Sequence, residues 1–291
     1  MLNTLTNVRL DSNCENPLIK EGKSNISIDF TMDIPIFETY CIEKTIKIIF
    51  KDVFLNMPDG VYKDEDGLIS NVELKQDGSE IIFSIKLYYN SIYKIEYIKG
   101  IPSKLNVIID RSPLSNILKG KTIILNPIYK SITKSPTSLM PHIPMKAIAN
   151  KLKFLLNLSK AEAVLTWENI DDINKINSDL NSNILINIST DVSEKNESGF
   201  KIYYSNKNLE SKRLGEIILK NLEIKSPLDN LGMYPKEMPL QNNNIIPVTV
   251  IPGIENNRLD DAHLRDVDYR NKVAQAIFNG ILKYYSQDNQ I

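Results

Sequence analysis

The sequence predicts two domains: a small β-sandwich, then an α/β domain with a mostly parallel sheet flanked by helices. Between residues 25 and 110, short β-branched and aromatic runs are separated by turn residues, with no helical period. After about residue 120, such runs alternate with segments whose apolar residues recur at helical spacing. The pattern changes within "RSPLSNILKG", so we place the domains at 23–111 and 120–287.

Composition excludes several classes of protein. The 291 residues are 42% hydrophobic and 24% charged, as in soluble globular proteins. A net charge of −1 gives no overall field that would attract nucleic acid or anionic lipid. No apolar run approaches the roughly 18 residues of a membrane span. The spacing of Cys14 and Cys41 matches no metal or redox motif.

The predicted sandwich is built from strands with alternating apolar residues. In "NISIDF", residues 25–30, the apolar side chains Ile26, Ile28 and Phe30 share one face. The runs "TIKIIF", "LISNVEL", "EIIFSIKLYY", "YKIEYI" and "KLNVIID" follow, separated by turns such as "MPDG" and "QDGS". Residues 1–22 are polar and without period, so we expect a frayed lead-in.

The second domain alternates strands with helices. The expected strands are "KTIIL", "AEAVLTW", "NILINIS", "GFKIYYS" and "IIPVTVI". The expected helices cover residues 144–158, 170–180 and 208–222, with a last helix that Asp268 caps. That last helix carries an apolar face at helical spacing, formed by Val273, Ile277, Ile281 and Tyr284.

Several stretches of the second domain resemble one family. In chain order they are "AVLTWENIDD", "SGFKIYYS", "ESKRLGEIIL", "PGIENN" and "LRDVDYRNKVAQAIFNGILKYY". Together they are similar to the zinc-dependent N-acetylmuramoyl-L-alanine amidases of bacterial cell-wall turnover, from about residue 120 to 286. Trp167 stands where that family usually has Arg. The strand "KLNVIID", residues 104–110, resembles the end of the AMIN domain that often precedes these amidases, which implies a sandwich that binds peptidoglycan or other envelope material.

The resemblance implies a zinc site whose ligands this sequence lacks. In the family two histidines and a glutamate hold zinc, and a second glutamate moves the proton. The first histidine position holds Tyr129, after the strand "TIILNP", and the second holds Ser189. The ligating glutamate position holds Pro141, with His142 beside it, and the catalytic glutamate position holds Ile251. We therefore expect vestigial positions, no bound metal and no cofactor.

Other arrangements stay open. A rebuilt metal site would need His142, Asp191 and Glu255 together, and His263, expected to be exposed, is the only other histidine. Asp191, Glu255 and Trp167 are candidates for binding in the old cleft. The aromatic residues of "YKIEY" and Trp167 are either packing residues or a platform for a sugar ring. Ser189 as a nucleophile lacks a partner at a known spacing.

The expected function is therefore that of a non-catalytic amidase homologue. It would bind peptidoglycan or a cell-wall partner protein, such as an active amidase, as a regulator or scaffold in wall or spore remodelling. The alternatives are an active amidase with a rearranged metal site and a purely structural protein-interaction module. We expect an extracytoplasmic location, with an export signal or anchor trimmed from the sequence, while a cytoplasmic one stays open.

Overall fold

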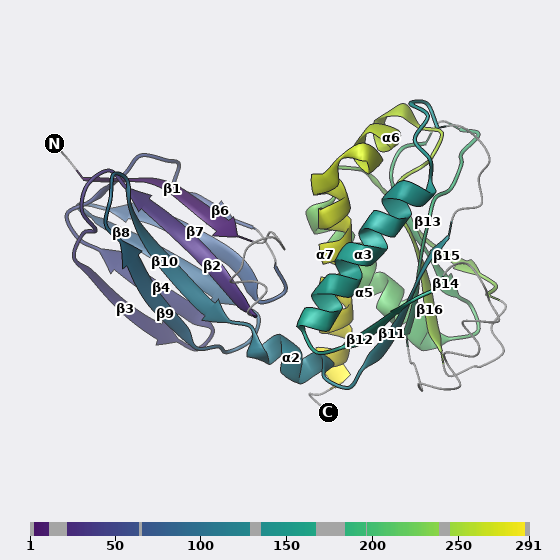
Figure 1. Ribbon diagram of the computed structural model, residues 1–291, viewed down its shortest axis with the longest axis horizontal. Helices are drawn as coiled ribbons and strands as arrows, with labels where there is room; N and C mark the ends of the chain where they lie inside the picture. The colour runs from purple at the N-terminus through teal and green to yellow at the C-terminus, as the bar shows by residue number, and fades with distance from the viewer. Residues whose placement is uncertain are drawn as a thin grey trace. The chain divides into compact units, whose positions relative to one another are not determined.

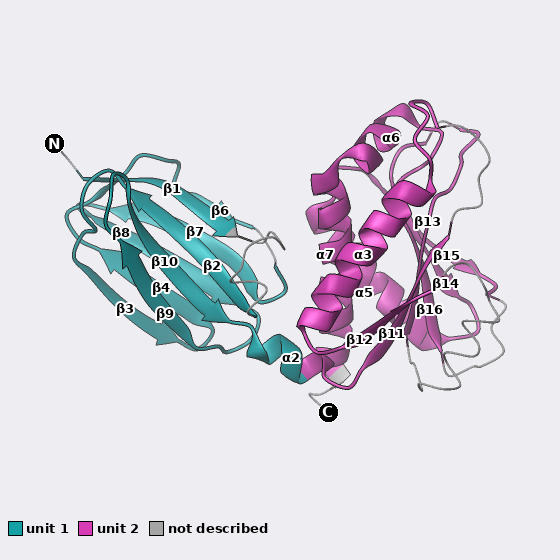
Figure 2. Ribbon diagram, viewed as in Figure 1, with its two compact units in different colours: residues 1–116 teal, residues 117–291 magenta. Residues whose placement is uncertain are grey.

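The computed structural model describes residues 3–11, 22–63, 66–128, 135–166, 184–195, 197–238 and 245–288 (Figure 1). The chain divides into two compact units, residues 1–116 and residues 117–291 (Figure 2). The predicted helix at 170–180 lies outside the described residues.

The first unit is the predicted β-sandwich. One five-stranded sheet has the order β5 (Phe54–Leu55), β1 (Thr4–Asp11), β2 (Lys23–Phe30), β10 (Ser103–Asp110), β9 (Tyr93–Ile98). The other has the order β3 (Phe37–Ile42), β4 (Thr45–Phe50), β8 (Glu80–Leu87), β7 (Ile69–Asp77), β6 (Gly60–Tyr62). Alternate residues of the central strands fill the core, among them Phe30 and Phe50, whose rings meet edge to face at 5.1 Å.

The frayed lead-in expected for residues 1–22 is wrong for its first part. Strand β1 pairs antiparallel with β2, Leu5 is fully buried, and Arg9 forms an ion pair with Asp29 at 2.8 Å. A domain limit at residue 23 is therefore too late. The sequence "TLTNVRLD" hides this strand because its mostly polar side chains leave no clear alternation.

A buried ion pair closes the end of the sandwich where the chain leaves it. The Arg111 guanidinium donates to the Asp66 carboxylate at 2.5 Å and to the Ser24 hydroxyl at 2.8 Å. The same carboxylate accepts the amides of Leu68 and Ile69. Burial alone would raise the pKa of Asp66, but Arg111 and these hydrogen bonds lower it overall. The pair joins β2, the start of β7 and the end of β10.

The second unit is the predicted α/β domain. Its sheet has the order β12 (Glu162–Leu165), β11 (Thr122–Ile128), β13 (Ile184–Ser189), β16 (Ile246–Ile251), β14 (Phe200–Ser205), β15 (Asn230–Lys236). Neighbouring strands are parallel except β14 and β16, which are antiparallel. Strand β15 was not predicted, because its sequence "NLGMYPK" contains Gly and Pro and it lies at the edge of the sheet.

Helices α3 (His142–Leu158), α5 (Leu209–Lys225) and α7 (Val267–Asp288) gather on one side of the sheet (Figure 1). Helix α6 (Arg258–Arg265) precedes α7, and α2 (Ser112–Leu118) precedes β11. Helices α5 and α7 approach closely at Gly280, where an added Cβ would lie 2.6 Å from Cγ1 of Ile218. Within the described ranges, no helix is both long and apolar enough to cross a lipid bilayer.

Candidate functional site

The carboxyl ends of the central parallel strands meet at one edge of the sheet, which is where α/β proteins usually bind ligands. Ile128 at the end of β11 lies opposite Ser189 at the end of β13. Ile188 lies opposite Val250, so the next residues, Ser189 and Ile251, end neighbouring strands. The structure thus brings these two predicted positions together.

The third described position lies at the start of α3. Pro141 precedes the first turn and half-buried His142 opens the helix. The approach to α3 is held against α6, because the Thr137 amide donates to the Asp261 carboxylate at 3.1 Å and the Thr137 hydroxyl donates to it as well. Arg265 in turn donates to Thr137. Tyr129 and Trp167 lie outside the described residues.

A row of uncharged polar side chains lies just inside this edge of the sheet. Its members on β13 and β16 come two residues before Ser189 and Ile251. The Thr166 hydroxyl donates to Asn126 at 3.0 Å, Asn126 donates to Asn187 at 2.9 Å, and Asn187 donates to Thr249 at 3.2 Å. All four side chains are buried. This row was not predicted, because only the strand register shows which residues are opposite one another.

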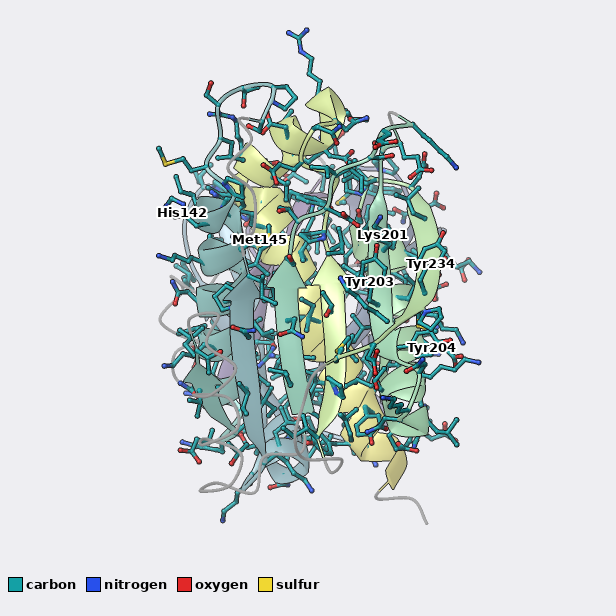
Figure 3. All side chains as sticks on the ribbon, turned by 90° about the vertical axis from the view of Figure 1, so that its right-hand side faces the viewer. His142, Met145, Lys201, Tyr203, Tyr204 and Tyr234 are labelled. Atoms are coloured by element: carbon teal, nitrogen blue, oxygen red, sulfur yellow. The ribbon has the colours of Figure 1, made fainter. Side chains whose placement is uncertain are left out.

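The row continues into a charged cluster on β14. Ile202 and Tyr204 face Gly215 of α5, so Lys201 and Tyr203 point to the opposite face of the sheet, the one seen in Figure 3. Tyr203 lies opposite Thr249. Figure 3 shows Lys201, Tyr203 and Tyr234 together, with His142 and Met145 across the sheet on α3.

Asp191 is the centre of this cluster. Its carboxylate accepts bonds from the Lys201 ammonium and the Tyr203 hydroxyl, both at 2.8 Å. A second ammonium, that of Lys236, lies 4.6 Å from the centroid of the Tyr203 ring, and the Tyr234 ring lies 6.2 Å from it. The cluster therefore offers cations and aromatic rings around one engaged carboxylate.

The electrostatics of the cluster follow from these contacts. Partial burial alone would raise the pKa of Asp191, but hydrogen bonds from Lys201 and Tyr203 lower it overall. Burial alone would lower the pKa of Lys201, but the bond to Asp191 raises it overall. Burial, with the bond to Asp191, raises the pKa of Tyr203. At neutral pH the Asp191–Lys201 contact is an ion pair.

Glu255 joins the loops that follow β13 and β16. Its side chain is only 4% exposed and accepts a bond from the Thr190 hydroxyl at 3.1 Å, while its amide donates to the Asp191 carbonyl at 2.7 Å. The structure thus brings Asp191 and Glu255 together, as candidates for one cleft.

Neither carboxylate joins His142 in a metal site. Across the part of the chain that the structure describes, no three His, Cys, Asp or Glu side chains are placed to hold a metal ion. Asp191 is paired with Lys201, and the Ser189 hydroxyl donates to the Thr190 carbonyl at 3.3 Å. A zinc ion with three protein ligands does not fit this set of donors.

Two further residues organise the edge and were missed from the sequence. The buried Asp260 carboxylate accepts the Ile254 amide at 2.7 Å, the Gly199 amide at 2.9 Å and the Ser198 hydroxyl at 2.5 Å. Tyr269 donates to the Pro252 carbonyl, and burial raises its pKa. Both hold the loop after β16. His263 is half-buried rather than exposed, because its ring packs 5.3 Å from that of Tyr269.

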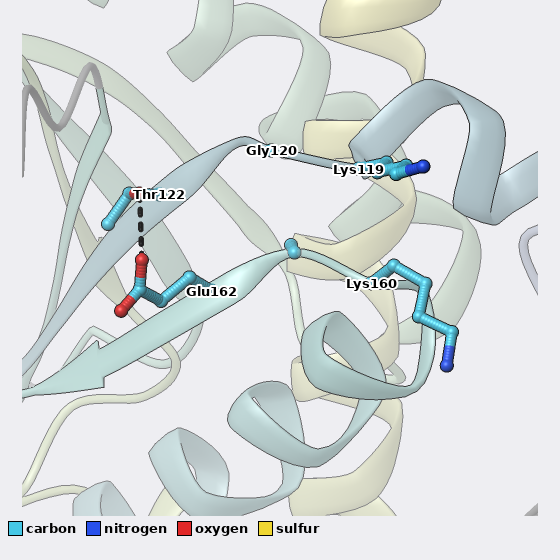
Figure 4. Close-up of a pocket in the computed structure, with 6 residues that line it drawn as sticks. Lys119, Gly120, Thr122, Lys160 and Glu162 are labelled. Atoms are coloured by element: carbon cyan, nitrogen blue, oxygen red, sulfur yellow. Dashed lines mark hydrogen bonds between the residues drawn. The ribbon is translucent and has the colours of Figure 1, made fainter.

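A hollow of about 450 Å³ lies at the opposite end of β11 and β12 (Figure 4). Its lining includes Lys119, which follows α2, and Lys160, which follows α3. Ammonium groups at helix carboxyl ends offset the helix dipole, and Thr122 donates to Glu162 at 3.3 Å within the hollow. The positions of these residues are explained by the chain reversals after α2 and α3 and by the pairing of β11 with β12.

Comparisons with known proteins agree with the fold of the second unit. Residues 143–283 match the family model described as N-acetylmuramoyl-L-alanine amidase, Amidase_3. The class of the second unit is therefore an amidase-type α/β domain. More particularly, this unit belongs to the N-acetylmuramoyl-L-alanine amidase family.

Individual relatives are distant. The "Probable cell wall amidase LytH" of Staphylococcus epidermidis is 27% identical over 197 residues, which cover 65% of this chain and 67% of that protein. The CwlD amidase of Clostridioides difficile, solved in complex with the GerS lipoprotein, is 25% identical, with a TM-score of 0.53, and the match covers 58% of this chain and 100% of CwlD. The amidase AmiC2 of Nostoc punctiforme shares the fold, with 20% identity, a TM-score of 0.53, and coverage of 58% and 99%.

Proposed function

We propose that the chain is a non-catalytic N-acetylmuramoyl-L-alanine amidase homologue that binds peptidoglycan or a cell-wall partner protein. One observation carries the proposal: the carboxyl edge of an amidase-type sheet ends in Ser189 and Ile251, with Pro141 at the start of α3. These residue types cannot supply the two histidines and two glutamates that the resemblance implies. Hydrolysis through a bound zinc therefore lacks both its ligands and its base.

The side chains that replace such chemistry are suited to binding. The exposed residues Lys236 and Tyr234 present an ammonium group and a ring on the face of β14 and β15 that also carries Lys201 and Tyr203. Ammonium groups pair with the carboxylates of a peptide stem, and tyrosine rings stack against sugars. The β-sandwich, which resembles an AMIN domain, would supply a second contact with the glycan.

The relatives support this setting. LytH proteins are named as cell wall amidases, and CwlD was solved in complex with a lipoprotein. We therefore propose that this chain acts outside the cytoplasm, in the bacterial envelope. A partner protein such as an active amidase, and a role in wall or spore remodelling, belong to the same proposal.

The experiment measures metal content, hydrolysis and binding on one preparation of the full chain. We expect zinc far below one ion per chain, no new alanine amino termini from purified peptidoglycan, and co-sedimentation with peptidoglycan that EDTA does not change. Lys236→Gln should reduce this binding, because it removes an exposed ammonium group from this face. Lys207→Gln is the matched control, because Lys207 is exposed and paired with Glu237.

The other outcomes are distinct. Stoichiometric zinc with EDTA-sensitive release of alanine peptides would establish an active amidase with a rearranged site and reject the proposal. Neither binding nor hydrolysis, with stable association to envelope proteins instead, would favour the structural interaction module.

A further inference from the structure

Strand β9 lies at the edge of its sheet and has a sequence that reads almost the same in both directions. Residues 92–98 are "IYKIEYI", in which Ile95 is the centre and Lys94 and Glu96 exchange places on reversal. Among the described strands, β9 pairs only with β10. Residues 93–97, for which the sequence suggested packing or a sugar platform, thus lie on a strand whose outer edge pairs with no described strand.

At alternate residues of β9, the backbone amide and carbonyl point away from β10. The Asp110 amide donates to the Ile92 carbonyl at 3.0 Å, so residue 92 belongs to a hydrogen-bonded pair with β10. In an antiparallel ladder these pairs alternate, and the register to Ile98 has no bulge. The amides and carbonyls of Tyr93, Ile95 and Tyr97 therefore point away from the sheet.

The side chains along this edge are apolar and unusually exposed. Ile92 is 76% exposed, Tyr97 63% and Ile98 55%, and Ile101 just beyond the strand is 95% exposed. Tyr93 is held at the adjacent edge of the second sheet by a 3.0 Å bond between its hydroxyl and that of Thr39. A long apolar edge strand invites pairing with another strand.

From these observations we infer that two copies of this chain associate by antiparallel pairing of their β9 strands, centred on Ile95. In that register Ile92 lies opposite Ile98, Tyr93 opposite Tyr97, and Lys94 opposite Glu96 of the partner, twice each by symmetry. The outward amides and carbonyls of Tyr93, Ile95 and Tyr97 face the same groups of the partner strand, as a hydrogen-bonded antiparallel pair requires.

The charges favour a second copy over an unrelated strand. Lys94 and Glu96 form an ion pair on one face of β9. Across the symmetric pair the four charges alternate in sign, so that every close neighbour is opposite. A foreign strand would have to reproduce both this alternation and the tyrosine and isoleucine positions. The five-stranded sheet that contains β9 would then continue into the same sheet of the second copy.

Sedimentation velocity of the full chain, in a reducing buffer so that the exposed Cys41 cannot form a disulfide, tests the inference. The wild-type chain should dimerise as its concentration rises from low micromolar upward. Lys94→Glu and Glu96→Lys should each weaken the dimer by about tenfold or more, because each places like charges opposite one another twice. The double variant K94E/E96K restores the alternation and should return the dimer to nearly wild-type strength.

Two further variants separate pairing from other effects. Tyr97→Pro removes an outward amide that β10 does not use and should abolish the dimer while the melting temperature changes little, since edge strands accept proline. Lys75→Glu, the same charge change on an exposed residue of β7, should leave the dimer unchanged. A wild-type chain that stays monomeric throughout, or a folded double variant that remains as weak as the single ones, would overturn the inference.

Discussion

The Lys201 ammonium donates to the Asp191 carboxylate at 2.8 Å, which ties β14 to the loop that follows β13. Replacing Lys201 with Met leaves this half-buried carboxylate without its cation, so the pKa of Asp191 should rise. We expect a loss of about 1 kcal/mol in the free energy of unfolding at pH 7, because partial exposure screens the pair. Urea denaturation of both proteins measures it.

The sign of the pH dependence follows from the lowered pKa of Asp191. The contribution of ionised Asp191 to the free energy of unfolding is complete above its unfolded-state pKa of about 4. It is lost as the pH falls through the lower folded-state pKa. The difference between wild type and Lys201→Met should therefore shrink in strong acid. An equal difference at pH 7 and pH 2.5 would contradict the assignment.

The buried pair of Arg111 and Asp66 predicts a large effect in the first unit. Arg111→Met should lower its free energy of unfolding by about 3–5 kcal/mol, because an unpaired carboxylate remains buried. The double change Arg111→Met with Asp66→Leu should cost less than Arg111→Met alone, although the amides of Leu68 and Ile69 lose an acceptor. Thermal unfolding followed by circular dichroism gives both values, and a double variant worse than the single one would refute this account.

The close approach of α5 and α7 predicts that Gly280 does not tolerate a side chain. Its added Cβ would lie 2.6 Å from Cγ1 and 3.1 Å from the Cα of Ile218, so the backbone has to move. Gly280→Ala should cost about 1–3 kcal/mol by overpacking, despite the better helix propensity of alanine. Gly100→Ala, whose Cβ would meet its nearest atom at 3.4 Å, is the control and should be nearly neutral in calorimetry.

The polar row across the sheet predicts that Asn187 is needed for both of its partners. Asn187→Leu removes the bond from Asn126 at 2.9 Å and the bond to Thr249 at 3.2 Å, and should cost about 1–3 kcal/mol. Hydrogen exchange should then speed up in β13 and β16 first. Ser189→Ala, on the same strand but outside the row, should change stability by less than about 1 kcal/mol. Equal costs for the two variants would mean that the row adds nothing beyond packing.

Much of the fold followed from local patterns, because a two-residue alternation and a helical period each report which face of an element is buried. The sandwich strands β2, β4, β7, β8, β9 and β10 and helices α3, α5 and α7 were predicted in this way. The edge strands β3, β5, β6 and β15 were missed, and so was β1, because short strands and strands with polar, Gly or Pro residues leave no such pattern.

The site was predictable only in part. The resemblance placed Ser189 and Ile251 at strand ends, and the structure agrees, but Lys201 and Tyr203 were seen only as residues of a strand. Their role depends on Asp191, ten residues away from Lys201 and on another segment. Which side chains meet across a sheet is set by register, and a single sequence does not contain it.

The row of Thr166, Asn126, Asn187 and Thr249 contains no group that titrates between acid and alkaline conditions. These four side chains therefore keep the same protonation state in acidic and in neutral media. Any dependence of ligand binding on acidity would have to come from the ligand or from charged residues such as Asp191, and not from this row.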